Sequence, residues 1–339
     1  MSAGLGSIVG QERVTERLTR ALAAGTAHHA YLFDGPEGVG KRTTARAFAM
    51  SANCLAPPSP GAACGTCEAC RKIAEDLHPD VISFGVFDEE GKVKGQKDRI
   101  RKLIGTLAFP PHEGRTRVVI VDPADGIEEE QSNVFLKTLE EPPPRTHFIL
   151  VTPRAASLRV TIRSRCQRGS FRALSDEEVA RVIVQSGEID NCTKEQVAEA
   201  ASLAQGSPGR ALALLADGDA PRRRELARKL LEAARAHKPS VVLEAAGELG
   251  GDRDEAAAIV EQMLIRYHDA LLVAEGVDEG RLAGARLDEA RWLAKGITPR
   301  GLLRGIELLN DATEALDGNM GPALAFEGLL LGLGMAHAA

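Results

Sequence analysis

The sequence predicts an α/β domain with a parallel sheet flanked by helices, followed by two smaller parts that are helical throughout. Three observations predict this fold class. Short, continuously apolar runs separated by helical segments are typical of strands that are buried on both faces of a parallel sheet. A glycine-rich turn joins the first of these runs to a helix. After about Ala173 the strand-like runs stop, and helical patterns continue along the chain.

The elements follow from local signals. The apolar runs occupy 30–33, 81–84, 118–121 and 148–151, and each is expected to form a strand. The helix expected over 43–53 follows the glycine turn, and a second helix over 129–141 is stopped by three prolines, which cannot continue a helix. Ser175 and Glu178 are typical of a helix start with a capping box.

The domain boundaries are expected near changes in these patterns. The α/β part extends over 1–172, a small helical part over 173–218, and a larger helical part over 219–339. The break before the last part is indicated by the run Asp217-Gly218-Asp219-Ala220-Pro221.

Composition excludes several classes of protein. The net charge is −6, from 42 Lys+Arg and 48 Asp+Glu, which argues against a surface that binds nucleic acid as a whole but is compatible with a local basic patch. With 9 Phe, 2 Tyr and 1 Trp, a base-stacking platform for single strands is not expected. No apolar run approaches the ~20 residues of a membrane span, and the first residues lack the features of a signal peptide. We therefore expect a cytoplasmic protein that does not associate with membranes.

Four of the six cysteines form a cluster. Cys54, Cys64, Cys67 and Cys70 fall within 17 residues, whereas Cys166 and Cys192 stand alone. In a reducing compartment such a cluster is more often a metal site than a disulfide framework. Four thiolates are the number that a closed, structural Zn²⁺ site requires, and we expect zinc to stabilise this irregular loop. An iron–sulfur cluster or free thiols are the alternatives.

The glycine turn has the context of a phosphate-binding loop. Gly35, Gly38, Gly40 and Lys41 lie between a strand and a helix, where backbone N–H groups and the helix N-terminus can face an anion. The usual pattern continues with Ser or Thr, whose hydroxyl binds Mg²⁺, but Arg42 stands here. Thr43 and Thr44 come next and lie on other faces of the helix. The alternative is a tight turn that binds nothing.

A second nucleotide-site element is also altered. Asp122 ends the apolar run 118–121, where a carboxylate that assists Mg²⁺ binding is expected. The next residue, where an ATPase carries a catalytic carboxylate, is Pro123. Because both the hydroxyl and the catalytic carboxylate are missing, we expect no intrinsic ATP turnover.

Four segments carry a family resemblance. They are 35–41, Asn133-Val134-Phe135-Leu136-Lys137-Thr138-Leu139-Glu140-Glu141-Pro142-Pro143, Ile162-Arg163-Ser164-Arg165-Cys166, and Gly206-Ser207-Pro208-Gly209-Arg210-Ala211-Leu212. In this order and spacing they resemble the AAA+ subunits of the bacterial sliding-clamp loader. The resemblance implies an AAA+ domain with an inserted zinc module at 54–70, a lid domain and a C-terminal all-α collar.

Two kinds of clamp-loader subunit share these segments: the ATP-hydrolysing gamma/tau motor and the delta-prime stator. The departures at Arg42 and Pro123 make the sequence resemble delta-prime, a component of the DNA polymerase III holoenzyme. A gamma/tau-type motor that uses Thr43 or Thr44 to bind Mg²⁺ is the alternative. Whether the chain's own site binds ATP and Mg²⁺ stays open, because Gly40 and Lys41 are retained.

The resemblance implies roles for three further residues. Arg165 is implied to be an arginine finger that acts in trans on ATP bound by a neighbouring subunit; the alternative is an ordinary member of a solvated basic cluster with Arg159, Arg163 and Arg168. Thr152 and Arg210 match the first and second sensor positions of a degenerate nucleotide site; the alternative for Arg210 is that it only holds the small helical part against the α/β part.

The resemblance also implies partners. These are the other subunits of a hetero-oligomeric clamp loader (gamma/tau and delta), the sliding clamp, and primed DNA bound through the complex. A third hypothesis, an isolated zinc-containing DNA-binding module, is disfavoured by the net negative charge.

Overall fold

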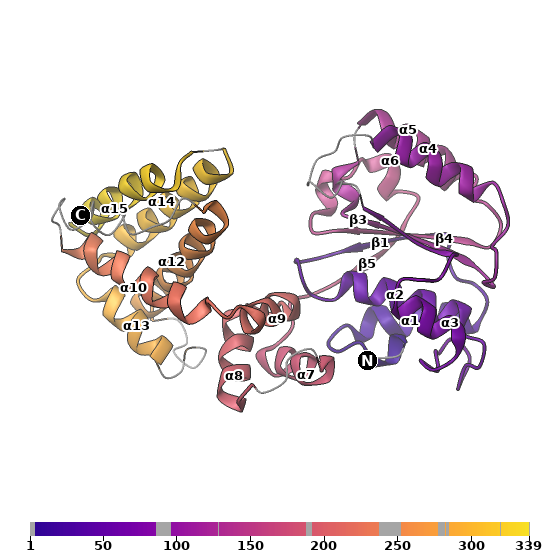
Figure 1. Cartoon of the computed structure of the whole chain (residues 1–339), viewed down its shortest axis with the longest axis horizontal. Coiled ribbons are helices and arrows are strands. Elements are labelled where there is room, and N and C mark those ends of the chain that lie inside the picture. Colours follow the sequence, from indigo (N-terminus) through magenta and orange to yellow (C-terminus); the bar gives the residue numbers. More distant parts are fainter. Residues whose placement is uncertain are drawn as a thin grey trace. The chain divides into compact units, whose positions relative to one another are not determined.

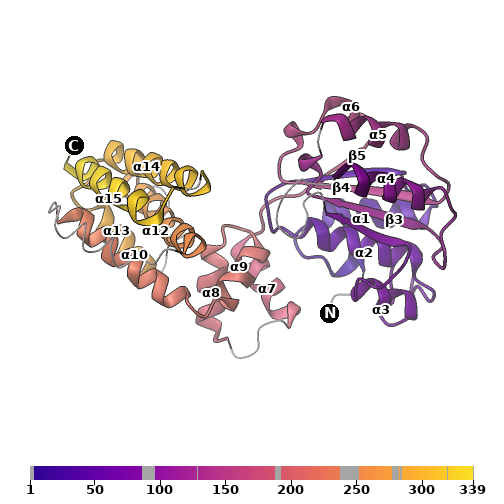
Figure 2. The ribbon, with the colours of Figure 1, turned by 45° about the horizontal axis from the view of Figure 1, so that its top comes forward.

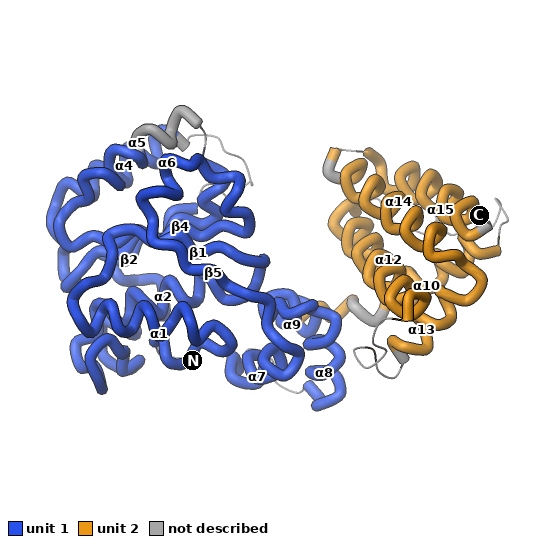
Figure 3. Tube along the Cα trace, turned by 180° about the vertical axis from the view of Figure 1, so that it is seen from behind, with its two compact units in different colours: residues 1–215 blue, residues 216–339 orange. Residues whose placement is uncertain are grey.

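The computed structural model describes residues 4–85, 96–127, 129–187, 192–236, 252–276, 282, 285–318 and 320–338. The side chains of 128–134 lie outside the description, and these include Asn133 and Val134 of the second family segment. The chain divides into two compact units, Met1–Leu215 and Ala216–Ala339 (Figure 3). Each unit is described by itself below.

The first unit is built on a five-stranded sheet in the order β2-β3-β4-β1-β5. All adjacent strands pair in parallel. The strands are β1 (Ala30–Asp34), β2 (Val81–Gly85), β3 (Arg117–Asp122), β4 (Thr146–Thr152) and β5 (Gln167–Ser170). The four predicted strands are confirmed, and β5 was not predicted.

Helices cover both faces of this sheet (Figures 1 and 2). One face carries α1 (Glu12–Ala23), α2 (Lys41–Asn53) and α3 (Glu68–Ala74), and the other carries α4 (Gln96–Leu107), α5 (Glu129–Glu140) and α6 (Val160–Arg163). Side chains alternate along each strand. Tyr31 and Phe33 of β1 therefore pack in the core of the first face, while Ala30 and Leu32 pack in the core of the second. Burial on both faces explains the apolar runs of the inner strands β1, β3 and β4, whereas the edge strands β2 and β5 are partly exposed.

Short 3₁₀ turns complete the α/β part: η1 (Leu5–Ser7), η2 (Ala124–Gly126) and η3 (Ala155–Ser157). Three helices follow β5: α7 (Asp176–Ser186), α8 (Lys194–Leu203) and α9 (Pro208–Ala216). The predicted capping box at the start of α7 is confirmed, because the Glu178 N–H donates to Ser175 Oγ and the Ser175 N–H donates to Glu178 Oε2. The predicted architecture, a parallel sheet flanked by helices and followed by helical parts, is thus confirmed.

The second unit is helical in all of its described elements. They are α10 (Ala220–Arg235), α12 (Arg253–Ala274), α13 (Ala285–Ala294), α14 (Pro299–Asp317) and α15 (Pro322–Ala338). Its core includes Leu230 and Leu231 of α10 and Ile259, Met263 and Tyr267 of α12. Among the described residues, none of the helices is both long enough and apolar enough to cross a membrane.

Candidate functional site

The glycine loop connects the carboxyl end of β1 to the first turn of α2. Gly35, Gly38 and Gly40 have φ values of 145°, 71° and 94°, in the region that residues with a side chain rarely adopt. A Cβ on Gly38 would lie 2.2 Å from Ser207 Oγ. The Gly209 N–H donates to the Gly38 carbonyl at 3.0 Å. The loop therefore needs glycine both for its backbone angles and for the close approach of the start of α9.

Three strand ends meet beside this loop. In the parallel register Asp34 of β1 lies opposite Thr152 of β4, and Asp122 ends the next strand, β3. Ligands of open α/β sheets bind outside the carboxyl ends of the strands. The topology thus brings together the residues that the sequence places at separate strand ends.

A cavity of about 980 Å³ opens at this edge of the sheet. Among the predicted nucleotide-site residues, Gly38, Gly40, Lys41, Thr43 and Asp122 line it. Its apolar lining includes Ile8, Val9, Val182 and Leu212. Further charged residues also line it: Glu37, Arg42, Arg46, Asp125 and Arg154. The volume and the mixture of apolar walls with a few charged groups are typical of a site for a small ligand.

Lys41 is buried at the cavity, with 6% of its surface exposed. Its Nζ donates to the carbonyl of Gly35 at 2.6 Å and to that of Pro36. Burial lowers the pKa of Lys41, and the negative charge of Asp122 only partly offsets this effect. The ammonium is therefore held inside the loop, where an anionic ligand could exchange with the two carbonyls.

Arg42 provides a positive charge near Asp122. Burial raises the pKa of Asp122, and among the neighbouring cations Arg42 opposes this shift most, followed by Lys41. Arg42 also lines the cavity, as does Pro123. A guanidinium thus accompanies the carboxylate at the position where Mg²⁺ would need a hydroxyl ligand.

The two threonines after Arg42 differ in their surroundings. Thr44 is fully buried and its Oγ1 donates to the Gly40 carbonyl at 2.8 Å, so its hydroxyl faces the helix interior rather than the cavity. Thr43 is exposed and lines the cavity. Of the two hydroxyls that the motor hypothesis invokes, Thr43 alone faces the cavity.

Gly35, Thr152 and Arg210 lie next to the cavity without lining it. Thr152 is fully buried, and its Oγ1 donates to Asp125 Oδ1 at 2.8 Å. Arg210 is half-buried in the first turn of α9. The two sensor assignments stay predictions.

Arg165 lies near the amino-terminal ends of the strands, whereas the glycine loop lies at their carboxyl ends. Arg165 precedes β5, whose first residue, Gln167, pairs with Tyr31 near the start of β1, whereas the glycine loop follows the end of β1. The length of β5 alone separates the two ends by about 10 Å. The guanidinium forms an ion pair with Glu140 at the end of α5, and Nη1 donates to the Thr161 carbonyl at 2.8 Å. The described contacts of the Arg165 guanidinium are thus with Glu140 and Thr161 and not with the chain's own glycine loop.

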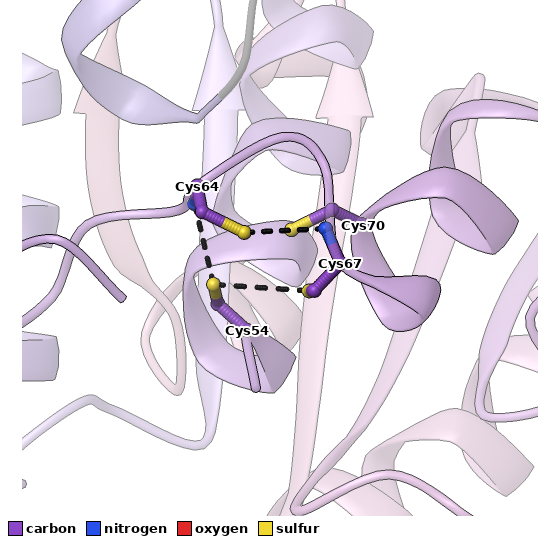
Figure 4. A group of neighbouring side chains, drawn as sticks. All are labelled: Cys54, Cys64, Cys67 and Cys70. Atoms are coloured by element: carbon purple, nitrogen blue, oxygen red, sulfur yellow. Dashed lines mark hydrogen bonds between the residues drawn. The ribbon is translucent and has the colours of Figure 1, made fainter. Parts of the chain in front are cut away.

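The four clustered cysteines converge on one point (Figure 4). Their sulfur atoms all lie within 4.8 Å of one another, and Cys54 Sγ and Cys67 Sγ are 4.0 Å apart. A tetrahedral site with Zn–S bonds of about 2.3 Å needs sulfur–sulfur distances of about 3.8 Å, so the arrangement fits such an ion. N–H groups of Thr66 and Cys67 lower the pKa of Cys64 to about 6, whereas burial raises the pKa values of Cys54 and Cys70 in the absence of a metal ion. The geometry is compatible with zinc, whose bound ion would cross-link the segments that carry the four thiolates.

Some residues and contacts of the site could not be predicted from the sequence. Arg46 of α2 and Ala74 of α3 line the cavity, although neither belongs to a recognised segment. Arg168 forms a two-point pair with Asp34, with Nε to Oδ1 at 2.8 Å and Nη2 to Oδ2 at 2.5 Å, which joins β5 to the end of β1 beside the glycine loop. The strand–loop–helix order was the only available signal for these contacts, and it does not specify which side chains meet.

The chain is similar to several known proteins. Residues 10–175 match the family described as DNA polymerase III, delta subunit. The chain is 31% identical to the DNA polymerase III subunit tau of Bacillus subtilis over 94% of its own length and 59% of the relative. It is 38% identical to the subunit gamma/tau of Mycobacterium tuberculosis over 55% of its length and 32% of the relative. The chain therefore spans between about a third and three fifths of these curated relatives. A DNA polymerase III gamma subunit-related protein of Thermotoga maritima superposes with a TM-score of 0.45 at 17% identity, over 95% of this chain and 99% of that one.

Proposed function

We propose that this chain, whose residues 10–175 match the DNA polymerase III delta-subunit family and which is similar to a tau subunit, is a subunit of a bacterial clamp loader. Within that complex we assign it the delta-prime type of role. It would support loading of the sliding clamp on primed DNA without hydrolysing ATP itself.

The presence of Arg42 and Asp122 at one cavity carries the non-hydrolysing part of the proposal. ATP hydrolysis in this kind of site needs a hydroxyl for Mg²⁺ and a carboxylate that positions water. Arg42 occupies the hydroxyl position, and its charge acts on Asp122, while Pro123 occupies the position of the carboxylate. A cation next to Asp122 weakens Mg²⁺ binding there by like-charge repulsion. The cavity can still hold a nucleotide, so the proposal separates binding from turnover.

The position of Arg165 supports a role in trans. It lies at the sheet edge away from its own glycine loop, and its side chain is 35% exposed. A guanidinium placed against the γ-phosphate of a neighbouring subunit stabilises the charge of the transition state. To reach that phosphate, Arg165 would exchange its ion pair with Glu140 for the phosphate oxygens.

The second unit offers a surface for the other subunits, gamma/tau and delta. Leu324, Leu331 and Met335 of α15 have exposed fractions of 62%, 43% and 76% and, by helical spacing, share one face with Gly328. Apolar residues at this spacing on a helix surface are typical of helix–helix assembly. This face would serve as the collar contact of a hetero-oligomer.

A motor of the gamma/tau type is the second candidate. Two observations favour it. The relatives with similar sequences are tau and gamma/tau subunits, and Thr43 lines the cavity. The two candidates differ in one measurable property, because a motor hydrolyses ATP at its own site.

Two assays test the proposal. The purified chain should show no Mg²⁺-dependent ATP turnover on its own, and substantial turnover would favour the motor. In the reconstituted complex, Arg165→Ala should lower hydrolysis at the neighbouring site by about 10³-fold, measured as phosphate release in a single turnover. Arg159→Ala is the matched control, since it removes an exposed arginine from the same basic cluster and should change the rate by less than about twofold. Equal effects of the two substitutions would contradict a finger role.

A further inference from the structure

The four-cysteine site joins one end of a pair of helices. Cys54 directly follows α2, Cys67 is the N-cap residue of α3, and Cys70 lies inside α3. A metal ion bound by these thiolates would fix the end of α2 to the beginning of α3. The two helices lie side by side on the same face of the sheet (Figures 1 and 2).

Arg46 joins the other end of the same pair. Its Nη2 donates to the carbonyl of Ile73 at 3.3 Å and to that of Ala74, the last residues of α3, and lies 3.5 Å from Asp76 Oδ2. The last carbonyls of a helix have no partners within the helix and carry partial negative charge, so a guanidinium there is favourable. The pair α2–α3 is therefore closed by the cysteines at one end and by Arg46 at the other.

The Arg46 end of this pair is a wall of the cavity. Arg46, Met50 and Ala74 all line the cavity together with the glycine loop. Because Lys41 begins α2, a single helix connects the glycine loop, Arg46 and the first cysteine. The cysteine site and the cavity thus share both helices.

The position of α3 depends on these contacts. α3 has only seven residues, too few for a helix to be stable by itself. It is held by the burial of Cys70 and Ile73, by Arg46, and by the cysteine site. Loss of the metal would remove the constraint on its first turn, and the loosened helix would carry Ala74 and the partner carbonyls of Arg46 away from the cavity.

We propose that metal binding at the four-cysteine site and nucleotide binding in the cavity are thermodynamically coupled through α3 and Arg46. Zinc strengthens the binding of an adenine nucleotide by holding the cavity wall in place. By reciprocity, the nucleotide strengthens the retention of zinc by the same factor. The inference rests on the nucleotide cavity of the proposed function and does not depend on Arg165.

The experiment measures the Kd of a fluorescent ADP analogue for the full chain. We expect the Kd to rise about fivefold or more when zinc is removed from the folded wild-type chain by a chelator, and again in the Cys64→Ser/Cys67→Ser variant. Cys192→Ser is the matched control, because Cys192 lies outside the cluster and should leave the Kd unchanged. Circular dichroism of each sample establishes that the chain remains folded, and the chelated wild type serves as the measurement should the double variant fail to fold.

The Arg46→Gln variant tests whether the coupling passes through Arg46. It should raise the Kd of the zinc-loaded chain about as much as zinc removal does, and removing zinc from this variant should then add little. Zinc release to a colorimetric chelator should slow when ADP is added to the wild type and should not respond to ADP in Arg46→Gln. Both results support the coupling.

Three results would overturn it: a Kd independent of zinc, additive effects of zinc removal and Arg46→Gln, or no nucleotide binding in either state. The last result would leave the Arg165 assay unaffected, so failure of this inference is distinguishable from failure of the stator role.

Discussion

Asp80 and Arg117 form a fully buried ion pair at the amino ends of β2 and β3. The carboxylate accepts hydrogen bonds from the N–H groups of His112, Glu113 and Gly114, each at 2.8 Å, and from Arg117 Nη2 at 3.2 Å. Burial alone would raise the pKa of Asp80, but these donors outweigh it and hold the pKa below its usual value. The pair therefore fixes the loop before β3 through charge rather than through apolar contact.

We predict that Asp80→Asn destabilises the chain by about 3 kcal/mol near neutral pH, because it leaves a buried guanidinium without its counter-charge. The folded pKa of Asp80 is depressed, so its contribution is present above the unfolded pKa of about 4 and is lost as pH falls through the folded value. The measurement is denaturant unfolding of both proteins from pH 7 down to pH 3.

The difference between the two proteins should shrink toward acid pH. A difference that stays constant over this range would contradict the assignment of the effect to the Asp80 charge. Asp98→Asn is the matched control, because Asp98 is largely exposed on α4 and should cost less than about 0.5 kcal/mol.

Single residues also show which features of the site can be predicted from the sequence. Arg42 and Pro123 are visible as departures from a pattern, and their placement at the cavity follows from the strand order. Asp80 and Arg46 belong to no pattern, because their partners lie 27 to 37 residues away in the sequence. Which carbonyl or N–H a long side chain reaches is decided by packing between elements and not by local sequence.

At the scale of elements, the glycine loop and α9 depend on each other. Gly38 has a φ of 71°, and a Cβ there would lie 2.2 Å from Ser207 Oγ at the start of α9. Gly25 has a similar φ of 66°, but a Cβ there would meet nothing within 4 Å. The two glycines share the backbone requirement and differ in the steric one.

We therefore predict that Gly38→Ala costs more stability than Gly25→Ala. Gly25→Ala should lower the free energy of unfolding by about 1 kcal/mol, the ordinary cost of a side chain in left-handed backbone. Gly38→Ala should lower it further, because the new methyl group also displaces α9 from the loop. Thermal unfolding of the two variants gives the comparison. In a Ser207→Ala background, which removes the clashing oxygen, the cost of Gly38→Ala should fall toward that of Gly25→Ala, and equal costs in both backgrounds would refute the contact.

The strands also show where an apolar run in the sequence predicts a strand and where it does not. β1, β3 and β4 are buried along most of their length and were predicted from their apolar runs, and the half-exposed edge strand β2 was predicted from Val81, Ile82 and Phe84. β5, with the sequence Gln167-Arg168-Gly169-Ser170, is an edge strand whose outward side chains are exposed, and it carries no apolar run. Its place is set instead by its pairing with β1 and by the Arg168–Asp34 ion pair, which are contacts across the fold.

At the scale of the whole molecule, the two compact units have separate cores. The first unit packs its two cores on either face of the sheet. The second packs α10, α12, α14 and α15 around Leu230, Tyr267, Leu309 and Phe326, all of them fully buried. No residue is shared between these cores as described, so each unit contains the apolar burial that a domain needs to fold.

We predict from this division that the full chain unfolds in more than one step. Calorimetry should give a measured enthalpy larger than the van't Hoff enthalpy, because independent cores melt as separate cooperative units. The fragment 216–339, expressed alone, should be helical by circular dichroism and should melt cooperatively. A fragment that starts at 253 is the matched control: it lacks α10, whose Leu230 and Leu231 are fully buried, and should lose this cooperativity. A single transition with equal enthalpies, together with an unfolded 216–339 fragment, would show that the helical unit depends on the α/β unit for its stability.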